Sequence, residues 1–202
     1  MRNIPYLISY LLLLTSNTER LKVMVQNEKT LSSELLFEGK VVKLYKDEVE
    51  LENGYKTGRE WIKHPGGVCV VALDEEENVY FVEQFRYPFH TALMEIPAGK
   101  LEFGEDHREC GIRELKEEIG ATAESFEYLG CLYPTVAYDT EIIHMYLARG
   151  LNFGEQHLDE GEFLNVTKIP LSKAFEMVMN NELKDSKTQL AILKAAYKLK
   201  KS

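Results

Sequence analysis

Cysteine and histidine are too few and too scattered in this sequence to build a disulfide framework or a zinc site. The three cysteines, Cys69, Cys110 and Cys131, are an odd number at wide spacing, and they match no zinc-binding pattern. The five histidines occur singly, without a pair at H-x-x-x-H spacing. We therefore expect reduced, mostly buried thiols in a cytoplasmic protein.

Positive charge is also scarce. The chain has 24 Lys and Arg against 33 Asp and Glu, which gives a formal net charge of −9. Because nucleic-acid binders rely on Lys and Arg to neutralise backbone phosphates, we expect no nucleic-acid polymer as a partner. An acidic protein can still bind a small phosphorylated molecule when metal ions bridge the two negative partners.

The apolar run near the amino terminus is short. It extends from Ile4 to Leu14, too few residues to span a bilayer, so we expect no membrane partner. One interpretation is a weak signal-peptide core, although no A-x-A-like cleavage site follows it. Another is that residues 1–23 are an extension upstream of a natural start at Met24. We favour the extension, because the family resemblance described below begins after that methionine.

What the chain does contain is typical of one mixed α/β domain. Apolar residues make up 45% and charged residues 28% of the chain, whose 202 residues suffice for one well-buried domain. Turns are predicted at Asn53-Gly54 and at Pro65-Gly66-Gly67. Apolar segments between turns predict strands, and Pro88 closes one of them. The predicted strands lie within residues 40–51, 58–73, 78–88, 126–134 and 141–151.

Two helices are predicted at the carboxyl end. Apolar residues recur at i, i+3, i+4 and i+7 from Leu171 to Val178, which predicts an amphipathic helix over residues 171–180. A second helix is predicted to start at Ser186, where Ser-x-x-Gln fits a capping box with Gln189. It runs into a basic end at 198–201 that suits a helix carboxyl terminus.

A further helix is predicted over residues 106–119, capped by Asp106 and ended by Gly120. Ile112, Leu115 and Ile119 fall on one stripe of this helix, which we expect to face the core. Three carboxylates, on Glu114, Glu117 and Glu118, fall together on another stripe, where like charges repel. From the residues alone, this acidic stripe is either a solvated helix face or a set of hard oxygen ligands for Mg²⁺ or Mn²⁺.

The spacing around the acidic stripe resembles the Nudix box, G-x5-E-x7-R-E-U-x-E-E-x-G-U, in which U is aliphatic. The resemblance implies a Nudix hydrolase, which cleaves a nucleoside diphosphate linked to another moiety with the help of a metal ion. All seven fixed positions and both aliphatic positions match. They are Gly99, Glu105, Arg113, Glu114, Leu115, Glu117, Glu118, Gly120 and Ala121.

The resemblance extends to the ADP-ribose pyrophosphatase branch of that family. It is carried by the segments "FEGKVVKLYKDEVEL", "REWIKHPGGVCVVAL", "VEQFRYPF", "MEIPAGKLE" and "DEGEFL", and by the closing pair of helices. It implies an α/β/α sandwich around a mixed sheet, with an N-terminal strand region at 24–63 that forms a homodimer. The domain would cover residues 24–202, which leaves residues 1–23 outside it.

By this resemblance, the metal ligands are Glu114 and Glu118, then Glu117, with the backbone carbonyl of Ala98 as a further ligand. The implied metal is Mg²⁺, with Mn²⁺ as a possible substitute. Arg113 is expected to orient the carboxylates, and Glu105 to act as a structural or outer-shell acid.

The resemblance also implies substrate contacts. Arg86 would hold the phosphates or the terminal ribose, while Arg59 and Glu60 would lie near the adenine. Trp61, the one tryptophan, could stack on a base or be buried beside its strand.

A free carboxylate on a mobile loop is a better proton acceptor than a metal-bound glutamate. The resembling family places such a loop at "HLDEGEFL". Asp159, Glu160 and Glu162 are its candidates. We favour Glu160 as the base and Glu162 as an additional metal contact, and Glu141 is the next candidate for the base. Glu160, Glu162 and Glu117 thus form the expected catalytic set.

The expected reaction is hydrolysis of ADP-ribose to AMP and ribose 5-phosphate. The chain departs from the branch pattern at "YPTVAYDTE", where Val136 and Ala137 replace a Pro-Gly pair. This departure leaves open another nucleotide sugar or a nucleoside triphosphate as the substrate. A non-catalytic ADP-ribose sensor is a further alternative, but such a protein would normally have lost box carboxylates, and here all are present.

Overall fold

The computed structural model describes residues 27–102, 104–158 and 163–200. The proposed extension at residues 1–23 lies outside these ranges. Contacts between residues divide the chain into two compact units. Among the described residues, 27–33 and Asp47–Arg59 form one unit, and Glu34–Lys46 with those from Glu60 onward form the other.

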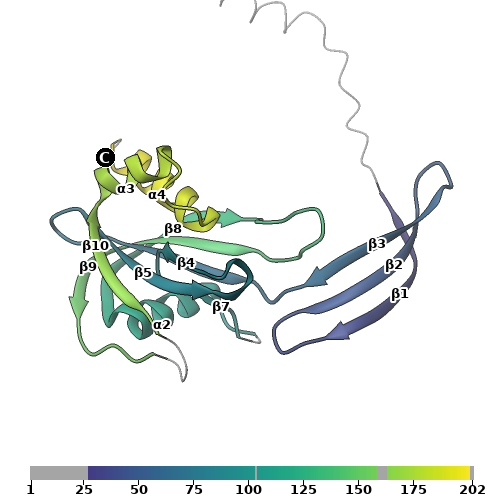
Figure 1. Ribbon diagram of the computed structural model, residues 1–202, viewed down its shortest axis with the longest axis horizontal. Helices are drawn as coiled ribbons and strands as arrows, with labels where there is room; N and C mark the ends of the chain where they lie inside the picture. Colours follow the sequence, from purple (N-terminus) through teal and green to yellow (C-terminus); the bar gives the residue numbers. More distant parts are fainter. Residues whose placement is uncertain (1–26, 103, 159–162, 201–202) are drawn as a thin grey trace, which may run out of the picture. The chain divides into compact units, whose positions relative to one another are not determined.

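Three strands near the amino terminus form a meander in the order β1-β2-β3 (Figure 1). They are β1 (Lys29–Glu38), β2 (Lys43–Glu50) and β3 (Lys56–Lys63). The predicted turn at Asn53-Gly54 joins β2 to β3, where Gly54 has a φ of 81° and its N–H donates to the Leu51 carbonyl. Such a positive φ favours glycine. Every residue of β1 is exposed.

The central sheet is mixed, as expected, with the strand order β7-β4-β9-β8. Strand β4 (Gly67–Ala72) pairs in parallel with β9 (Ile143–Phe153) and antiparallel with β7 (Ala98–Lys100). Strand β8 (Ala121–Leu132) pairs antiparallel with β9. All six residues of β4 are buried, which is typical of a strand covered on both faces.

A second sheet has the order β10-β5-β6 and is antiparallel throughout. Its strands are β10 (Asn165–Pro170), β5 (Asn78–Arg86) and β6 (Thr91–Glu95). A 3₁₀ turn, η1 (Tyr87–Phe89), contains Pro88 and joins β5 to β6. Only two residues separate Glu95, the end of β6, from the start of β7, so both sheets contribute to the region around residues 95–100.

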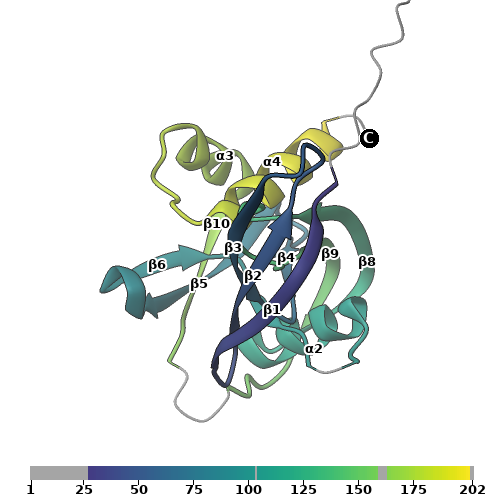
Figure 2. The same cartoon turned by 90° about the vertical axis from the view of Figure 1, so that its right-hand side faces the viewer.

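Helices cover both faces of the central sheet, which confirms the α/β/α architecture (Figures 1 and 2). The side chains of β4 alternate: Cys69 and Val71 belong to one core cluster, and Val68, Val70 and Ala72 to the other. The first cluster includes residues of α3 (Leu171–Met179) and α4 (Ser186–Leu199). The second includes residues of α2 (His107–Ile119).

The predicted ends of α2 are confirmed. The Asp106 side chain accepts hydrogen bonds from the N–H groups of Arg108 and Glu109, at 2.8 and 3.3 Å. Gly120 ends the helix with a φ of 68°. Leu115 and Ile119 are buried in the core as expected, whereas Ile112 is only half-buried.

The predicted capping box of α4 is wrong. The helix does start at Ser186, but its cap is Asp185, whose carboxylate accepts a hydrogen bond from the Thr188 N–H at 2.9 Å. The Gln189 side chain instead donates to the Leu183 carbonyl at 2.7 Å. Aspartate and serine cap helices about equally well, and the Asp185 carboxylate is held at this position by further contacts with the Thr188 hydroxyl and Lys187.

Within the described ranges, no helix is both long enough and apolar enough to cross a membrane.

Candidate active site

Helix α2 lies unusually close to the sheet at Gly111. A Cβ atom at this position would come within 2.9 Å of the Phe126 ring on β8 and 3.0 Å of a Val68 methyl on β4. Both distances are shorter than ordinary van der Waals contact. Glycine therefore allows the close approach that sets the helix against β4 and β8, with its acidic stripe beside β7.

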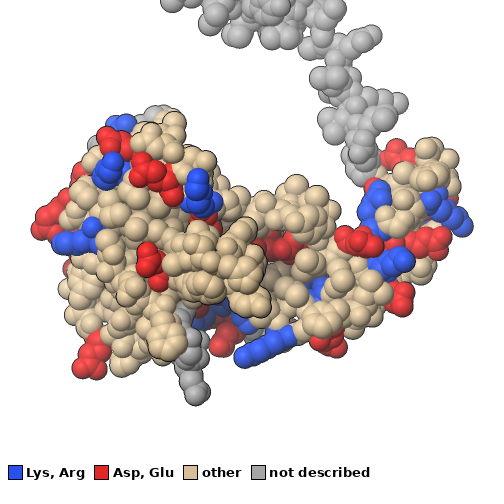
Figure 3. Space-filling model, viewed as in Figure 1, with Lys and Arg blue, Asp and Glu red and all other residues tan. Residues whose placement is uncertain are grey.

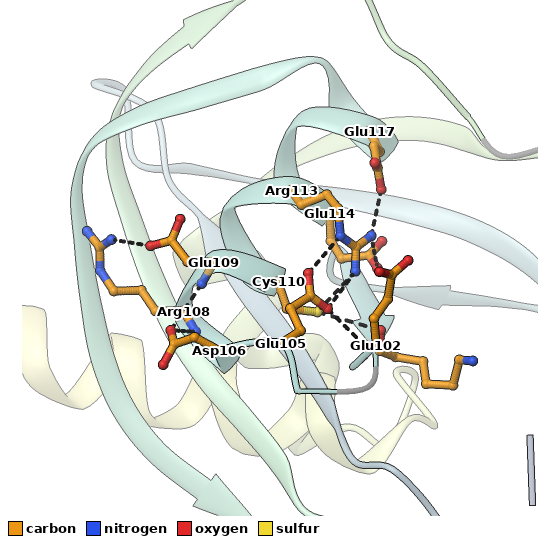
Figure 4. A network of polar contacts seen from close by, with 10 residues as sticks. Glu102, Glu105, Asp106, Arg108, Glu109, Cys110, Arg113, Glu114 and Glu117 are labelled. Carbon is orange, nitrogen blue, oxygen red and sulfur yellow. Dashed lines mark hydrogen bonds and ion pairs between the residues drawn. The ribbon is translucent and has the colours of Figure 1, made fainter.

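Arg113 is the centre of the polar network on this helix (Figure 4). Its Nε lies 2.9 Å from Glu105 Oε1, and its Nη2 lies 3.2 Å from Glu105 Oε2. Its Nη1 donates to both Glu114 and Glu117, each at 2.8 Å. One guanidinium thus orients three carboxylates, which offsets the repulsion expected from their spacing.

Glu105 is held most firmly by this arginine. Its carboxylate accepts the two Arg113 hydrogen bonds and a third from the Glu102 N–H, at 2.9 Å. Hydrogen bonding to Arg113 lowers the pKa of Glu105 to about 2, although partial burial opposes the shift. Glu105 therefore stays ionised under all ordinary conditions and ties the loop before α2 to the helix.

Two of the expected metal ligands lie against strand β7. A Cβ atom at Gly99 would come within 1.8 Å of Glu114 Oε1, so the carboxylate occupies the space that any larger residue would fill. Glu118 is 2% exposed, and its Oε2 accepts a hydrogen bond from the Ala98 N–H at 2.9 Å. Glu114 and Glu118 therefore converge on two neighbouring residues of one strand.

The described part of the chain has no cluster of three or more His, Cys, Asp or Glu side chains already gathered as a metal site. The donors beside β7 nevertheless suit a hard divalent cation. Glu114 and Glu118 supply carboxylate oxygens against Ala98 and Gly99, and Glu117 is joined to Glu114 through Arg113. Mg²⁺ and Mn²⁺ prefer such oxygen donors.

Arg86 ends β5 and pairs with Thr91 of β6, the strand that leads into β7. Its Nε and Nη2 donate to the two oxygens of Glu95, at 2.6 and 2.5 Å. Glu95 is 2% exposed and also receives a hydrogen bond from Lys187 of α4. Glu95 lies in the segment "MEIPAGKLE", but no local pattern in the sequence marks either Glu95 or Lys187 as a site residue.

Arg59, Glu60 and Trp61 all lie on β3. The guanidinium of Arg59 pairs with Glu28, through Nε at 2.8 Å and Nη2 at 2.6 Å. Trp61 is half-buried and stacks on Tyr45 of β2 with the ring centroids 4.5 Å apart. The expected role of these residues at the adenine end stays a prediction.

The candidate bases Glu160 and Glu162, with Asp159, lie outside the described residues. The segment just before them is tied to the end of α2: the Gly154 N–H donates to the Gly120 carbonyl at 2.7 Å, and the His157 N–H donates to the Glu117 carbonyl at 3.1 Å. The segment that leads to the candidate bases therefore begins beside the acidic stripe.

Glu141, the alternative base, lies 3.6 Å from His64 Nδ1. Burial raises the pKa of Glu141 above its ordinary value, although the nearby His64 opposes the shift. The Gly66 N–H donates to the same His64 nitrogen, at 3.1 Å. Such a raised pKa suits a proton acceptor, and Glu141 keeps its place as the second candidate.

The mixed sheet lies between two helical layers, and one helix presents carboxylates to a short strand, which is the arrangement expected from the Nudix box. A family model described as "NUDIX domain" matches residues 63–190. The chain belongs to the NUDIX family, and it is a hydrolase that acts on pyrophosphate bonds. The family generally uses a divalent metal ion.

Three relatives illustrate the range of similar proteins. The chain is 43% identical over 167 residues to a methanol dehydrogenase activator of Bacillus methanolicus, which covers 82% of this chain and 90% of the relative. It is 42% identical, with the same coverage, to an ADP-ribose pyrophosphatase of Bacillus subtilis (strain 168). It is 33% identical to an ADP-ribose pyrophosphatase of Mycobacterium tuberculosis, over 78% of each chain.

A solved structure titled "Crystal structure of ADP compounds hydrolase" has the same fold. Its TM-score is 0.77 at 19% sequence identity, and the match covers 87% of this chain and 95% of that one. At this identity the likeness concerns the fold alone.

Proposed function

We propose that this protein hydrolyses the diphosphate bond of ADP-ribose to AMP and ribose 5-phosphate. The observation that carries the proposal is the 42% identity to the Bacillus subtilis ADP-ribose pyrophosphatase over 82% of the chain. The complete Nudix box supports catalysis rather than sensing, because every box carboxylate is present.

In this proposal the metal ion, Mg²⁺ or Mn²⁺, is held by Glu114, Glu117 and Glu118 with the Ala98 carbonyl. When bound, the ion neutralises the substrate diphosphate and makes a water molecule more acidic. Arg113 keeps two of the glutamates oriented, through contacts of 2.8 Å to each. Arg86 binds a phosphate or the terminal ribose, and Arg59 and Glu60 contact the adenine end.

The proposed base is Glu160, with Glu162 as an additional contact to the metal ion. Each carries a carboxylate that the box does not use, and the preceding segment is tied to α2 through Gly154 and His157. Glu160 would take the proton of the attacking water, so that an oxygen–phosphorus bond forms as the diphosphate bridge breaks and AMP leaves.

The test is a comparison of substrates under one set of conditions. The kcat/KM of the purified protein is measured with Mg²⁺, and again with Mn²⁺, for ADP-ribose, ADP-glucose, GDP-mannose and a nucleoside triphosphate. The proposal predicts the highest kcat/KM for ADP-ribose. A higher value for any of the others by tenfold or more would reassign the substrate.

A second candidate function is activation of a methanol dehydrogenase. It is favoured by the 43% identity to the Bacillus methanolicus activator, which is as high as the identity to the pyrophosphatase. Adding the protein to a methanol dehydrogenase assay tests this role, with Glu118→Gln as a control for whether hydrolysis is needed.

We also infer that the protein is a homodimer joined through its N-terminal strands. Strand β1 is exposed along its whole length, and Leu31, Leu35, Leu36 and Phe37 are among its exposed side chains. Phe85, Tyr87 and Phe89 expose a second apolar surface at the end of the β5–β6 hairpin, where Figure 3 shows few charges. Large exposed apolar surfaces are typical of protein interfaces. Sedimentation equilibrium at micromolar concentration should give twice the mass of the chain, and a monomer would contradict the inference.

A further inference from the structure

Lys187 is a buried lysine in a place that does not favour one. It lies in the first turn of α4 and is 8% exposed. The amino end of a helix carries partial positive charge, so a cation there is unfavourable, and lysine is almost never buried without a partner. Its ammonium group is held by two carboxylates, Glu95 and Asp185, the second at 3.0 Å.

Glu95 connects this lysine to Arg86. The Glu95 carboxylate is buried and binds Arg86 through both oxygens, while Lys187 contacts the oxygen that Arg86 Nη2 also uses. Burial raises the pKa of Glu95, but the hydrogen bonds from Arg86 and Lys187 more than offset it and leave the pKa below its ordinary value. Glu95 is therefore an ionised anchor for two cations.

The Glu95 carboxylate fixes the orientation of the Arg86 guanidinium. Its Nε and Nη2 are bound by Glu95, and Nη1 has no hydrogen-bond partner among the residues that the structure describes. The Arg86 side chain is 37% exposed. One edge of the guanidinium is thus clamped to the protein, and the other edge is open to a ligand.

A second contact joins the same parts of the chain. The Ile96 N–H donates to the Thr188 hydroxyl at 3.1 Å, and that hydroxyl donates to Asp185 at 2.6 Å. Asp185, the cap of α4, and the first turn of that helix therefore hold both Glu95 and the residue that follows it, just before strand β7. The four charged groups of the network balance, with Arg86 and Lys187 against Glu95 and Asp185.

We propose that Lys187 is a positioning residue for substrate binding: through Glu95 it holds the Arg86 guanidinium in the orientation that binds the substrate diphosphate. This inference rests on the proposed function, because it takes Arg86 as a phosphate-binding residue. Arg86 would bind the substrate equally tightly in the ground state and in the transition state. A misplaced Arg86 should therefore raise KM more than it lowers kcat.

The kinetic test uses Lys187→Met. A hydrogen bond to a charged group contributes enough binding energy that its loss can weaken binding about tenfold. We therefore expect Lys187→Met to raise the KM for ADP-ribose about tenfold and to leave kcat within about twofold of wild type. Lys194→Met is the matched control, since Lys194 is a half-buried lysine of the same helix that donates to the Leu129 carbonyl instead. It should leave KM unchanged.

Two further variants separate positioning from folding. The double variant Lys187→Met with Asp185→Asn removes one positive and one negative charge and keeps a side chain that can cap the helix. It should therefore recover the melting temperature that Lys187→Met loses. Its KM for ADP-ribose should stay raised. In an Arg86→Ala background, Lys187→Met should raise KM no further, because both changes act through the same guanidinium. Recovery of KM in the balanced variant, or a full additional rise in the Arg86→Ala background, would overturn the proposal.

A spectroscopic measurement tests the link without any substrate. The Arg86 Nε–H is bound to a buried carboxylate, so its NMR signal should exchange slowly with water in the wild type and at least tenfold faster in Lys187→Met. Unchanged exchange would overturn the proposed positioning even if ADP-ribose is the substrate. Faster exchange in a protein that fails to cleave ADP-ribose would instead contradict the proposed function, and the kinetic test would then use the best substrate of the panel.

Discussion

Replacing Glu105 by Gln tests whether the Arg113 network holds the acidic helix in place. The substitution keeps the size of the side chain and one oxygen acceptor, but it removes the charge that faces Arg113 at 2.9 and 3.2 Å. The loop before α2 should then be tied less firmly to the helix, and the whole protein should be less stable at neutral pH.

The expected loss is about 2 kcal/mol. Lowering the pKa of a carboxyl from its ordinary value of 4.5 to about 2 corresponds to an upper limit of roughly 3 kcal/mol. The Arg113 side chain is 31% exposed and that of Glu105 16%, so solvent screens part of the interaction. Charge-assisted hydrogen bonds of this kind contribute about 1.5–3 kcal/mol.

The loss should depend on pH in a defined direction. Because the pKa of Glu105 is lower in the folded protein than in the unfolded one, its contribution is fully present above about pH 4.5. It is lost as the pH falls toward 2, where the carboxylate takes up a proton in both states. Wild type and Glu105→Gln should therefore differ most at pH 7 and converge between pH 4.5 and 2.

Urea unfolding followed by circular dichroism, at pH 7 and at several values down to the lowest at which the protein stays folded, measures this difference. Glu109→Gln is the control, since Glu109 pairs with Arg108 in an exposed contact of 3.3 Å that should contribute less than about 0.5 kcal/mol. Equal free energies of unfolding for wild type and Glu105→Gln at pH 7, or a difference that does not shrink at low pH, would show that the Glu105–Arg113 contact does not stabilise the fold.

The remaining predictions concern catalysis. Gly99→Ala should lower kcat by about 100-fold, because the Cβ of the alanine would displace the Glu114 carboxyl oxygen that lies 1.8 Å from that position. A kcat near that of the wild type would show that Glu114 need not lie against β7. Glu160→Gln should lower kcat about 100-fold or more with little change in KM, as expected for loss of a general base. If Glu160→Gln and Glu162→Gln both turn over normally, Glu141→Gln should be the variant that loses activity.

Local signals were enough to predict the acidic helix. Asp106 and Gly120 encode its two ends within a few residues of the chain, and the period of 3.6 residues sets which glutamates share a face. Turn residues and apolar runs likewise predicted the β2–β3 turn and strands β4, β5, β8 and β9. These features depend on neighbours in the sequence, so they could be derived without the fold.

Features that depend on tertiary packing could not be predicted in the same way. Strand β7 has only three residues and exists because it pairs with β4, which brings Ala98 beside Cys69. Asp185 and Ser186 are both reasonable helix caps, and the choice between them is tied to contacts with Thr188 and Lys187. In the sequence Lys187 resembles the other lysines of its helix, and only its packing against Glu95 distinguishes it.

Identifying the products formed from ADP-ribose tests the proposed reaction itself. The wild-type protein, and Glu118→Gln as a control, are incubated with ADP-ribose and Mg²⁺, and the phosphorus compounds are identified by ³¹P NMR. We expect equimolar AMP and ribose 5-phosphate from the wild type, and a rate lower by orders of magnitude from Glu118→Gln. Intact ADP-ribose after prolonged incubation with the wild type, or equal turnover by Glu118→Gln, would contradict this expectation.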